Sequence, residues 1–165
     1  MISAKPLKLI ISLLIPQLAG WIGAIFTTPS IASWYASINQ PNLTPPNWIF
    51  APVWTILYLL MGVAFYLVWT KSQGPIEWSR GRLKRTAFIV FFGQLALNTA
   101  WSIIFFGRHQ IGVALVEILL LWVVILPNII FFYRVRRLAG LLLVPYLLWV
   151  SFAIYLNAAI WTLNR

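Results

Sequence analysis

Few residues in this chain could carry acid, base or metal chemistry. Its only acids are Glu77 and Glu117, and its only histidine is His109. Paired-carboxylate hydrolysis, a Ser-His-Asp triad and a carboxylate-bridged metal centre all need groups that the chain lacks. Cysteine is absent, which excludes thiol nucleophiles, disulfides and thiolate metal sites. We therefore expect no catalytic residues, no metal site and no required cofactor.

Aromatic and amide side chains are the stronger candidates, and they suit ligand binding. The chain has ten tryptophans in 165 residues. Three apolar stretches carry such residues at helical spacing, so each set falls on one helix face. The sets are Trp54, Tyr58 and Met61; Gln94, Asn98 and Trp101; and Tyr146, Trp149 and Ala153. These faces predict a common pocket with flat apolar walls and a few hydrogen-bonding groups. Ordinary packing, with amides hydrogen-bonded between helices, explains the same pattern.

Three further features have simple interpretations beside functional ones. Glu117 is the one carboxylate inside an apolar stretch. Its functional interpretation is a proton site or a partner for a basic group, and the simple one is a side chain with a local hydrogen bond or one that reaches the interface. His109 lies in a short turn, where a solvated ring is the ordinary role and axial haem ligation the alternative. Ala96 and Ala100, beside Gly93, fit a close helix contact or a dimer seam.

The elements that must position these residues are transmembrane helices. The chain is 62% hydrophobic and 8% charged, with a mean hydropathy of +0.90. Five apolar runs meet the roughly 20 residues that a span requires. They cover residues 9–26, 51–69, 86–107, 111–133 and 138–163. We predict an all-α membrane protein, one domain over residues 1–165 that forms a five-transmembrane-helix bundle.

Prolines and tryptophans refine this picture of the spans. Prolines inside four of the runs predict bends, because a proline removes a helical hydrogen bond. They are Pro16, Pro52, Pro127 and Pro145.

Several tryptophans near span ends predict an aromatic belt at the membrane interface. They include Trp21, Trp69, Trp78 and Trp161.

The connections between the spans differ in character. Residues 27–47 are uncharged and rich in proline, which predicts a long ordered loop folded over the bundle, with room for a short helix. Residues 71–85 are polar and basic, which predicts an exposed loop.

Charge is distributed unequally between the two ends of a five-span bundle. Ten of the twelve basic residues fall on the side of the N-terminus, and only Arg108 and Arg165 fall on the other. The positive-inside rule then places the N-terminus in the cytoplasm of a bacterial plasma membrane protein. The net charge of +10 fits loops beside anionic membrane lipid, so nucleic acid is not an expected partner.

Several segments together resemble the tryptophan-rich sensory protein or translocator protein family (TspO/MBR), which includes the mitochondrial peripheral benzodiazepine receptor. The most specific segment, residues 41–69, reads PNLTPPNWIFAPVWTILYLLMGVAFYLVW. Others are WYASI from residue 34, ALNTAWSIIFF from residue 96 and PYLLWVSFAIYLN from residue 145. The likeness extends over nearly the whole chain.

This resemblance implies a five-helix bundle, commonly a homodimer, with a pocket capped by the first long loop. It implies porphyrins, haem and related tetrapyrroles as ligands, together with benzodiazepine-type compounds. The matching pocket positions are Tyr35, Trp54, Tyr58, Asn98, Trp101, Trp149 and Ala153. We therefore predict a membrane receptor or sensor that holds a flat tetrapyrrole and either transports or sequesters it.

Two other functions remain open at this point. One is light- or oxidant-dependent porphyrin degradation, with Trp54 and Trp149 as redox-active indoles. The other is a lipid or sterol carrier. The end of the fifth span departs from the cholesterol motif of animal relatives, because Ala158 and Ala159 stand where aromatic residues occur there. Residues 63–71, which include Tyr66, satisfy only the loose cholesterol pattern.

Overall fold

The computed structural model describes the backbone of residues 4–71 and 77–165 and the side chains of residues 5–71 and 81–165. Within these ranges, five helical segments are long and apolar enough to cross a membrane. They are Lys5–Ile31, Asn47–Thr70, Gly81–Gly107, Ile111–Val135 and Arg137–Leu163. The prediction of an all-α, five-helix membrane protein is therefore confirmed.

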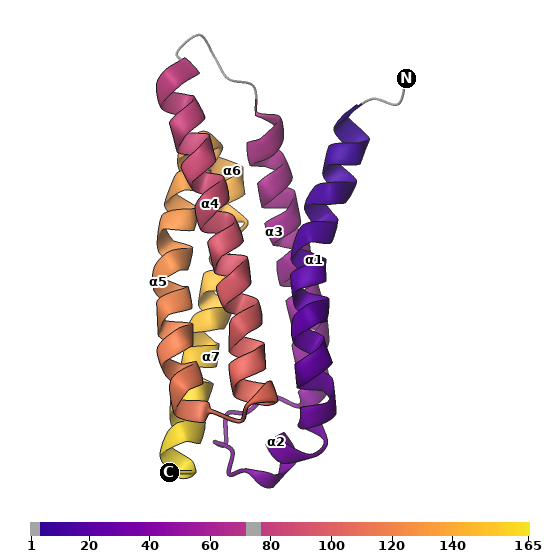
Figure 1. Ribbon diagram of the computed structural model, residues 1–165, viewed down its shortest axis with the longest axis vertical. Helices are drawn as coiled ribbons and strands as arrows, with labels where there is room; N and C mark the ends of the chain where they lie inside the picture. Colours follow the sequence, from indigo (N-terminus) through magenta and orange to yellow (C-terminus); the bar gives the residue numbers. More distant parts are fainter. Residues whose placement is uncertain (1–3, 72–76) are drawn as a thin grey trace.

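The helices run nearly side by side along the long axis of the molecule, and the two termini lie at opposite ends (Figure 1). α1 packs mainly against α3, α4 against α5, and α5 against α7. The elements are α1 (Ala4–Ile31), α2 (Trp34–Ser37), η1 (Asn47–Ile49), α3 (Phe50–Thr70), α4 (Glu77–Ser102), the π-helix η2 (Ile103–Gly107), α5 (Ile111–Val135), α6 (Arg137–Leu141) and α7 (Val144–Leu163).

Two helices extend well beyond their predicted spans, each by at least five residues at one end. α1 continues to Ile31, so the predicted loop of residues 27–47 begins later than expected. α4 begins at Glu77, so an exposed loop over residues 71–85 is wrong from that residue onward. The basic residues from Glu77 onward belong to α4 instead. A helix is compatible with their charge, because long cationic side chains can reach water from the end of a span while the backbone stays hydrogen-bonded.

The four prolines do not all lie in helix interiors. Pro16 and Pro127 lie within α1 and α5. Pro52 lies in the first turn of α3, and Pro145 occupies the start of α7. A proline in the first helical turn disturbs nothing, because the N–H that it lacks has no partner within the helix. The predicted bend at Pro145 coincides with a break in the fifth span, since α6 ends at Leu141 and α7 begins at Val144. A bend at Pro52 stays a prediction.

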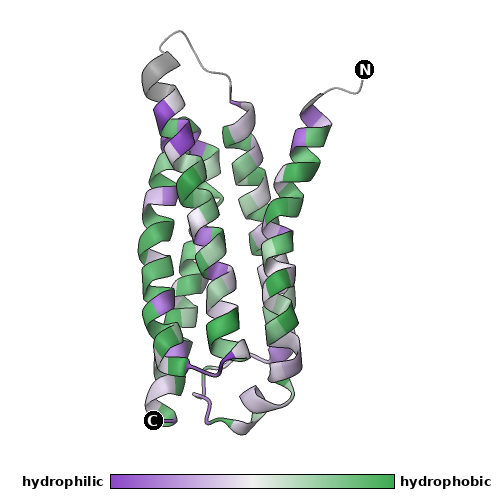
Figure 2. Cartoon of the chain, in the orientation of Figure 1, coloured by the Kyte–Doolittle hydropathy of each residue, from purple (hydrophilic) through white to green (hydrophobic). Residues whose placement is uncertain are grey.

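The half of the bundle nearer the N-terminus is filled by aromatic packing. The ring of Phe91 stacks on Phe65 at 4.9 Å and on Phe132 at 5.5 Å between centroids, which joins α3, α4 and α5. α1 approaches α3 closely at Gly62, where a Cβ atom would lie 2.7 Å from the carbonyl oxygen of Ser12. Hydrophobic residues also cover the outer lengths of the helices, as lipid contact requires (Figure 2).

Of the four tryptophans predicted at the membrane interface, three have described side chains. Trp21 is 60% exposed and Trp161 is 39% exposed. The guanidinium of Arg165 lies over the Trp161 ring, 5.0 Å from its centroid. The ammonium of Lys8 lies over the Trp69 ring, 5.5 Å from its centroid. The side chain of Trp78 lies outside the described residues. Aromatic rings paired with cations near helix ends suit the headgroup layer.

Candidate functional site

The site begins on α3, where helical spacing aligns two aromatic side chains. Trp54 and Tyr58 are one turn apart, and their rings stack with centroids 5.4 Å apart. Tyr58 is buried against α1 at Gly20, where a Cβ atom would lie 2.4 Å from its ring. The absence of a side chain at Gly20 therefore allows this tyrosine to occupy its position.

A buried amide on α4 forms the polar centre of the site. The hydroxyl of Tyr58 donates a hydrogen bond to Oδ1 of Asn98, and Nδ2 of Asn98 donates to the hydroxyl of Tyr146 at 3.2 Å. All three side chains are buried. The network connects α3, α4 and α7 without any charged group. Its polar atoms are hydrogen-bonded to one another, and no ion has to be desolvated.

The next aromatic wall comes from Trp101, one turn further along α4. Its indole Nε1 donates to Oδ1 of Asn157 at 3.1 Å, and Nδ2 of Asn157 donates to the carbonyl oxygen of Ile111 at 2.9 Å. The Trp101 ring also stacks on Phe105 at 5.0 Å. The indole is therefore fixed in orientation from both its edge and its face.

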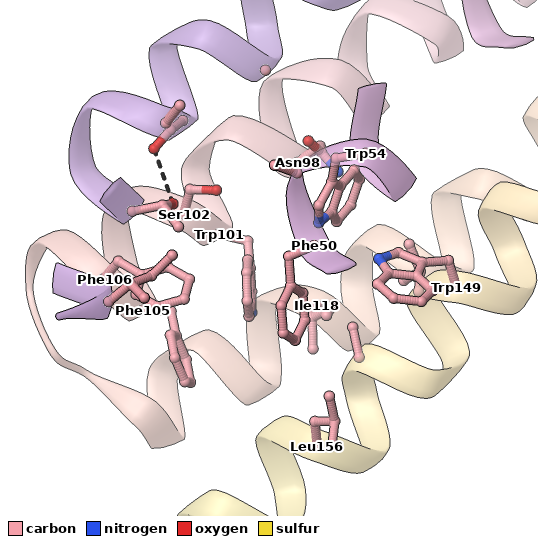
Figure 3. A pocket seen from close by; sticks show the side chains of 18 of the residues that line it. Phe50, Trp54, Asn98, Trp101, Ser102, Phe105, Phe106, Ile118, Trp149 and Leu156 are labelled. Carbon is pink, nitrogen blue, oxygen red and sulfur yellow. Dashed lines mark hydrogen bonds between the residues drawn. The ribbon is translucent and has the colours of Figure 1, made fainter. Parts of the chain in front are cut away.

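The opposite wall is formed by α7 and by the start of α3. The ring of Phe50 meets Trp149 edge to face, with centroids 6.0 Å apart. Ala153 follows Trp149 by one turn of α7 and leaves space beside it. The indoles of Trp54, Trp101 and Trp149 thus come from three different helices around Phe50 (Figure 3).

The connection between α1 and α3 closes the C-terminal end of the bundle. Tyr35 of α2 is 5% exposed and packs against Phe106 at 5.6 Å, and its burial raises the pKa of its phenol above the ordinary value. Ser30 donates to the carbonyl oxygen of Phe106 at 2.8 Å. The ordered loop with a short helix is confirmed, and we refer to residues 32–46 as the lid.

Two further contacts hold the lid to the rest of the chain. Trp34 stacks on His109 at 4.2 Å, and His109 has a positive φ of 55°. At the other contact, the backbone N–H of Asn39 donates to Oδ1 of Asn164 at 2.9 Å, and Nδ2 of Asn164 donates to the carbonyl oxygen of Asn39 at 2.9 Å. We call this reciprocal pair the amide clasp.

These walls and the lid enclose a cavity of about 340 Å³. All seven residues predicted for the binding site line it: Tyr35, Trp54, Tyr58, Asn98, Trp101, Trp149 and Ala153. Among the described residues, no side chain that lines this cavity is charged. That the seven residues bind a ligand stays a prediction, but the structure brings them together around one space.

Not every residue of the three helical stripes reaches the cavity. Met61 and Gln94 lie deeper in the bundle, where Nε2 of Gln94 is 3.9 Å from the sulfur of Met61. Tyr146 is buried behind Asn98 and supports it. The predicted pocket and the alternative of ordinary helix packing therefore both apply to each stripe, because one end of it lines the cavity and the other end packs between helices.

The residue-level reasoning missed the contribution of α1. Small residues at helical spacing along this helix line the cavity: Gly20, Gly23, Ala24 and Thr27. Their spacing was a readable signal of close approach between helices. The rings of Phe50, Phe105 and Phe106 were also missed, because phenylalanine in an apolar span gives no indication of which way it faces.

Glu117 and His109 do not line the cavity. Both carboxylate oxygens of Glu117 are buried and have no hydrogen-bond partner among the described residues. Within the described part of the chain, no group of three or more histidine and acidic residues could hold a metal ion. The described residues therefore form an aromatic cavity with an uncharged lining.

Comparison with known proteins gives a consistent result. The model of the TspO/MBR family matches residues 12–162. The chain is 42% identical over 158 residues to the tryptophan-rich protein TspO of Archaeoglobus fulgidus, an alignment that covers 96% of this chain and 97% of that protein. It is 40% identical over 152 residues to the translocator protein of Homo sapiens, with 92% and 87% covered. It is 34% identical over 145 residues to the tryptophan-rich sensory protein of Cereibacter sphaeroides, with 86% and 85% covered.

Proposed function

Since the chain belongs to the TspO/MBR family, we propose that it is a membrane receptor that binds a porphyrin or related tetrapyrrole in the aromatic cavity. The observation that carries this proposal is the arrangement of three indoles around one uncharged space. Flat aromatic ligands gain from stacking on flat walls, and a cavity of about 340 Å³ lies within the range of small-molecule sites. Benzodiazepine-type compounds fit the same chemistry.

The polar groups of the cavity suit ligand orientation better than catalysis. Asn98 and Tyr58 can exchange hydrogen bonds with a ligand atom, but neither is a strong acid or base at neutral pH. The ligand carboxylates of a porphyrin have no cation to meet inside the cavity, so they are expected at its mouth. This favours sequestration or transport of an intact ligand.

The test separates binding from chemical conversion. Purified protein is titrated with protoporphyrin in darkness and under illumination while the Soret band and tryptophan fluorescence are followed. Saturable quenching in both conditions, with the Soret band retained, supports a receptor. Loss of the Soret band with a new product band in light indicates porphyrin degradation instead, and the absence of saturable quenching contradicts the proposal.

The orientation in the membrane is a second part of the proposal. The end of the bundle that bears the N-terminus carries ten basic residues, which places it in the cytoplasm if the protein resides in a bacterial plasma membrane. The lid lies at the opposite end (Figure 1), and the cavity is lined there by Tyr35 of the lid. We propose that ligand enters from that outer side.

A homodimer is the third part. Gly93 on α4 has no atom within 4 Å of the position that a Cβ would take, and Ala96, close by on the same helix, is exposed. Small residues that face outward allow two helices to approach closely in a membrane. Crosslinking through a cysteine at Ala96 should trap a dimer, whereas a cysteine at Val116, which is 69% exposed on α5, should not.

A further inference from the structure

Two lysines meet at Trp69, at the end of the bundle opposite the lid: Lys84 binds its carbonyl oxygen and Lys8 lies over its ring. Lys84 of α4 donates through Nζ to the carbonyl oxygens of Trp69 at 2.8 Å and Lys71 at 3.0 Å, and so caps the last carbonyls of α3. The ammonium of Lys8, from α1, lies 5.5 Å above the Trp69 ring. Three helices therefore contribute to one small cationic cluster, which we call the lysine pair.

The charges of the lysine pair are close enough to oppose one another. Lys84 donates to the carbonyl oxygen of Trp69 and Lys8 lies over the ring of the same residue, so two like charges gather at one tryptophan. The carbonyl groups at the end of α3 offset part of this repulsion for Lys84, and the face of the Trp69 indole offsets part of it for Lys8. Among the described side chains the sole acid is Glu117, in the middle of α5, so no described carboxylate neutralises the pair. An anion held between the two ammonium groups would remove the repulsion.

The depth of the lysine pair identifies the kind of anion. Lys8 and Lys84 each lie three residues inside their apolar segments, Lys5–Ile31 and Gly81–Gly107. Three residues are about 5 Å of helix, which places both ammonium groups at the level of lipid headgroups. Exposed apolar residues lie beside them on α1, where Leu7 is 57% exposed and Ile11 is 37% exposed.

We propose that Lys8 and Lys84 bind the phosphate of an anionic phospholipid, with the Trp69 indole beneath the headgroup and an acyl chain along the apolar surface of α1. A phosphate presents several acceptor oxygens, so it can accept from both lysines at once. Inorganic phosphate shares the charge but lacks the acyl chain that the adjacent apolar surface would contact. The lipid would join the ends of α1, α3 and α4.

The experiment is native mass spectrometry of the full chain in detergent, titrated with phosphatidylglycerol and, separately, with phosphatidylcholine. The parent should retain phosphatidylglycerol selectively. Lys8→Gln or Lys84→Gln should weaken its binding about fivefold each, and the double variant about twentyfold, because each basic residue near a membrane surface contributes to anionic lipid binding by that order. Phosphatidylcholine binding should not change.

The matched control is Arg134→Gln, which removes a basic and exposed residue at the same end of the bundle. Equal weakening by this variant would show a diffuse electrostatic effect and overturn the site. Lys84→Arg keeps the charge and should bind phosphatidylglycerol like the parent. The thermal midpoint of each variant in lipid-free detergent shows whether it is folded. Displacement of phosphatidylglycerol by excess inorganic phosphate would overturn the lipid assignment. Selective binding that arises only in Glu77→Gln would show that this acid is the counter-ion in the parent.

Discussion

A single buried amide organises the inner wall of the cavity. Asn98 accepts from Tyr58 and donates to Tyr146, so one side chain fixes two phenol groups from different helices. Tyr58 in turn stacks on Trp54. The position of the Trp54 indole, which lines the cavity, therefore depends on a hydrogen bond that Tyr58 makes behind it. Binding sites in general are preorganised by such supporting contacts.

At this scale we predict that Trp54→Ala or Trp149→Ala weakens protoporphyrin binding at least about tenfold. Truncating a central aromatic residue of a binding site often costs roughly 2 kcal/mol, since stacking and buried area are both lost. Fluorescence titration of each purified variant measures the affinity. The thermal midpoint without ligand must be measured alongside, because loss of an indole can also loosen the bundle.

Trp122→Ala is the matched control for these two variants. Trp122 is half-buried on α5, and its Nε1 donates to Ser151 at 2.8 Å, but it does not line the cavity. Its removal should leave the affinity for protoporphyrin unchanged. If the two pocket variants stay folded and bind as tightly as Trp122→Ala, the aromatic faces serve packing alone.

Among the helices, the close approach of α1 to α3 and to α4 sets the width of the cavity. Gly20 touches the ring of Tyr58, and Gly23 lies where a Cβ atom would be 3.0 Å from the hydroxyl of Ser102. Glycine at these positions allows the helix backbone to form part of the cavity wall. A larger side chain would separate the helices or displace the tyrosine from Asn98.

We predict that Gly20→Ala lowers the thermal midpoint and weakens ligand binding. The added Cβ would lie 2.4 Å from the Tyr58 ring, and overpacking of a close contact typically costs about 1–3 kcal/mol. Gly93→Ala is the control, since its Cβ would meet nothing within 4 Å. Thermal unfolding followed by circular dichroism compares the two variants. A midpoint for Gly20→Ala equal to that of Gly93→Ala would contradict the described contact.

The lid is the element with the least support from helix packing. Tyr35 is buried, whereas Leu43 is 65% exposed and Trp48, which follows the lid, is 73% exposed. The amide clasp between Asn39 and Asn164 holds the lid to the C-terminal end of α7. Ligand should therefore act on the exposed part of the lid, because the segment around Tyr35 is already closed without it.

We predict that Asn164→Leu accelerates chymotrypsin cleavage at Leu43 and Trp48 several-fold, and that saturating protoporphyrin slows cleavage in the parent. Each neutral hydrogen bond of the clasp contributes about 1 kcal/mol, so its loss raises the population of the open lid. Cleavage products are identified by mass spectrometry. Thr162→Val, which removes only a hydrogen bond within α7 to Ala159, should cleave at the parent rate. Identical rates for all three proteins would mean that the clasp does not control the lid.

The molecule as a whole is asymmetric along its long axis. The end that bears the N-terminus has a packed aromatic core and nearly all of the basic residues. The other end has the cavity, the lid and two basic residues, Arg108 and Arg165. A bundle with a solid half and a hollow half can hold a ligand without losing the contacts that keep its helices together.

We predict that cysteines at Arg82 and Gln110 react from opposite sides of the membrane. Both residues are exposed, they lie at opposite ends of the third membrane span, and the chain has no cysteine of its own. The positive-inside rule places Arg82 on the cytoplasmic side. Labelling of intact cells with a membrane-impermeant maleimide should modify the cysteine at Gln110 and reach the one at Arg82 only after lysis. Modification of both in intact cells would contradict the topology.

Local properties of the sequence were sufficient for much of this structure. The number of spans followed from apolar length, since a lipid bilayer demands about 20 apolar residues for every crossing. The faces of Trp54 and Asn98 followed from the 3.6-residue period, which needs no knowledge of the neighbouring helices. Helix ends were less predictable, because Arg82 and Lys84 are polar in sequence and yet extend α4 beyond the apolar run.

Tertiary structure decided which faces meet and what lies between them. Nothing local to Gly20 shows that it touches Tyr58, or that the carbonyl oxygen of Phe106 in the π-helix accepts from Ser30, 76 residues earlier. The same applies to the amide clasp, which joins residues 125 positions apart. Such contacts depend on the relative position of whole helices, and that position results from the packing of the entire bundle.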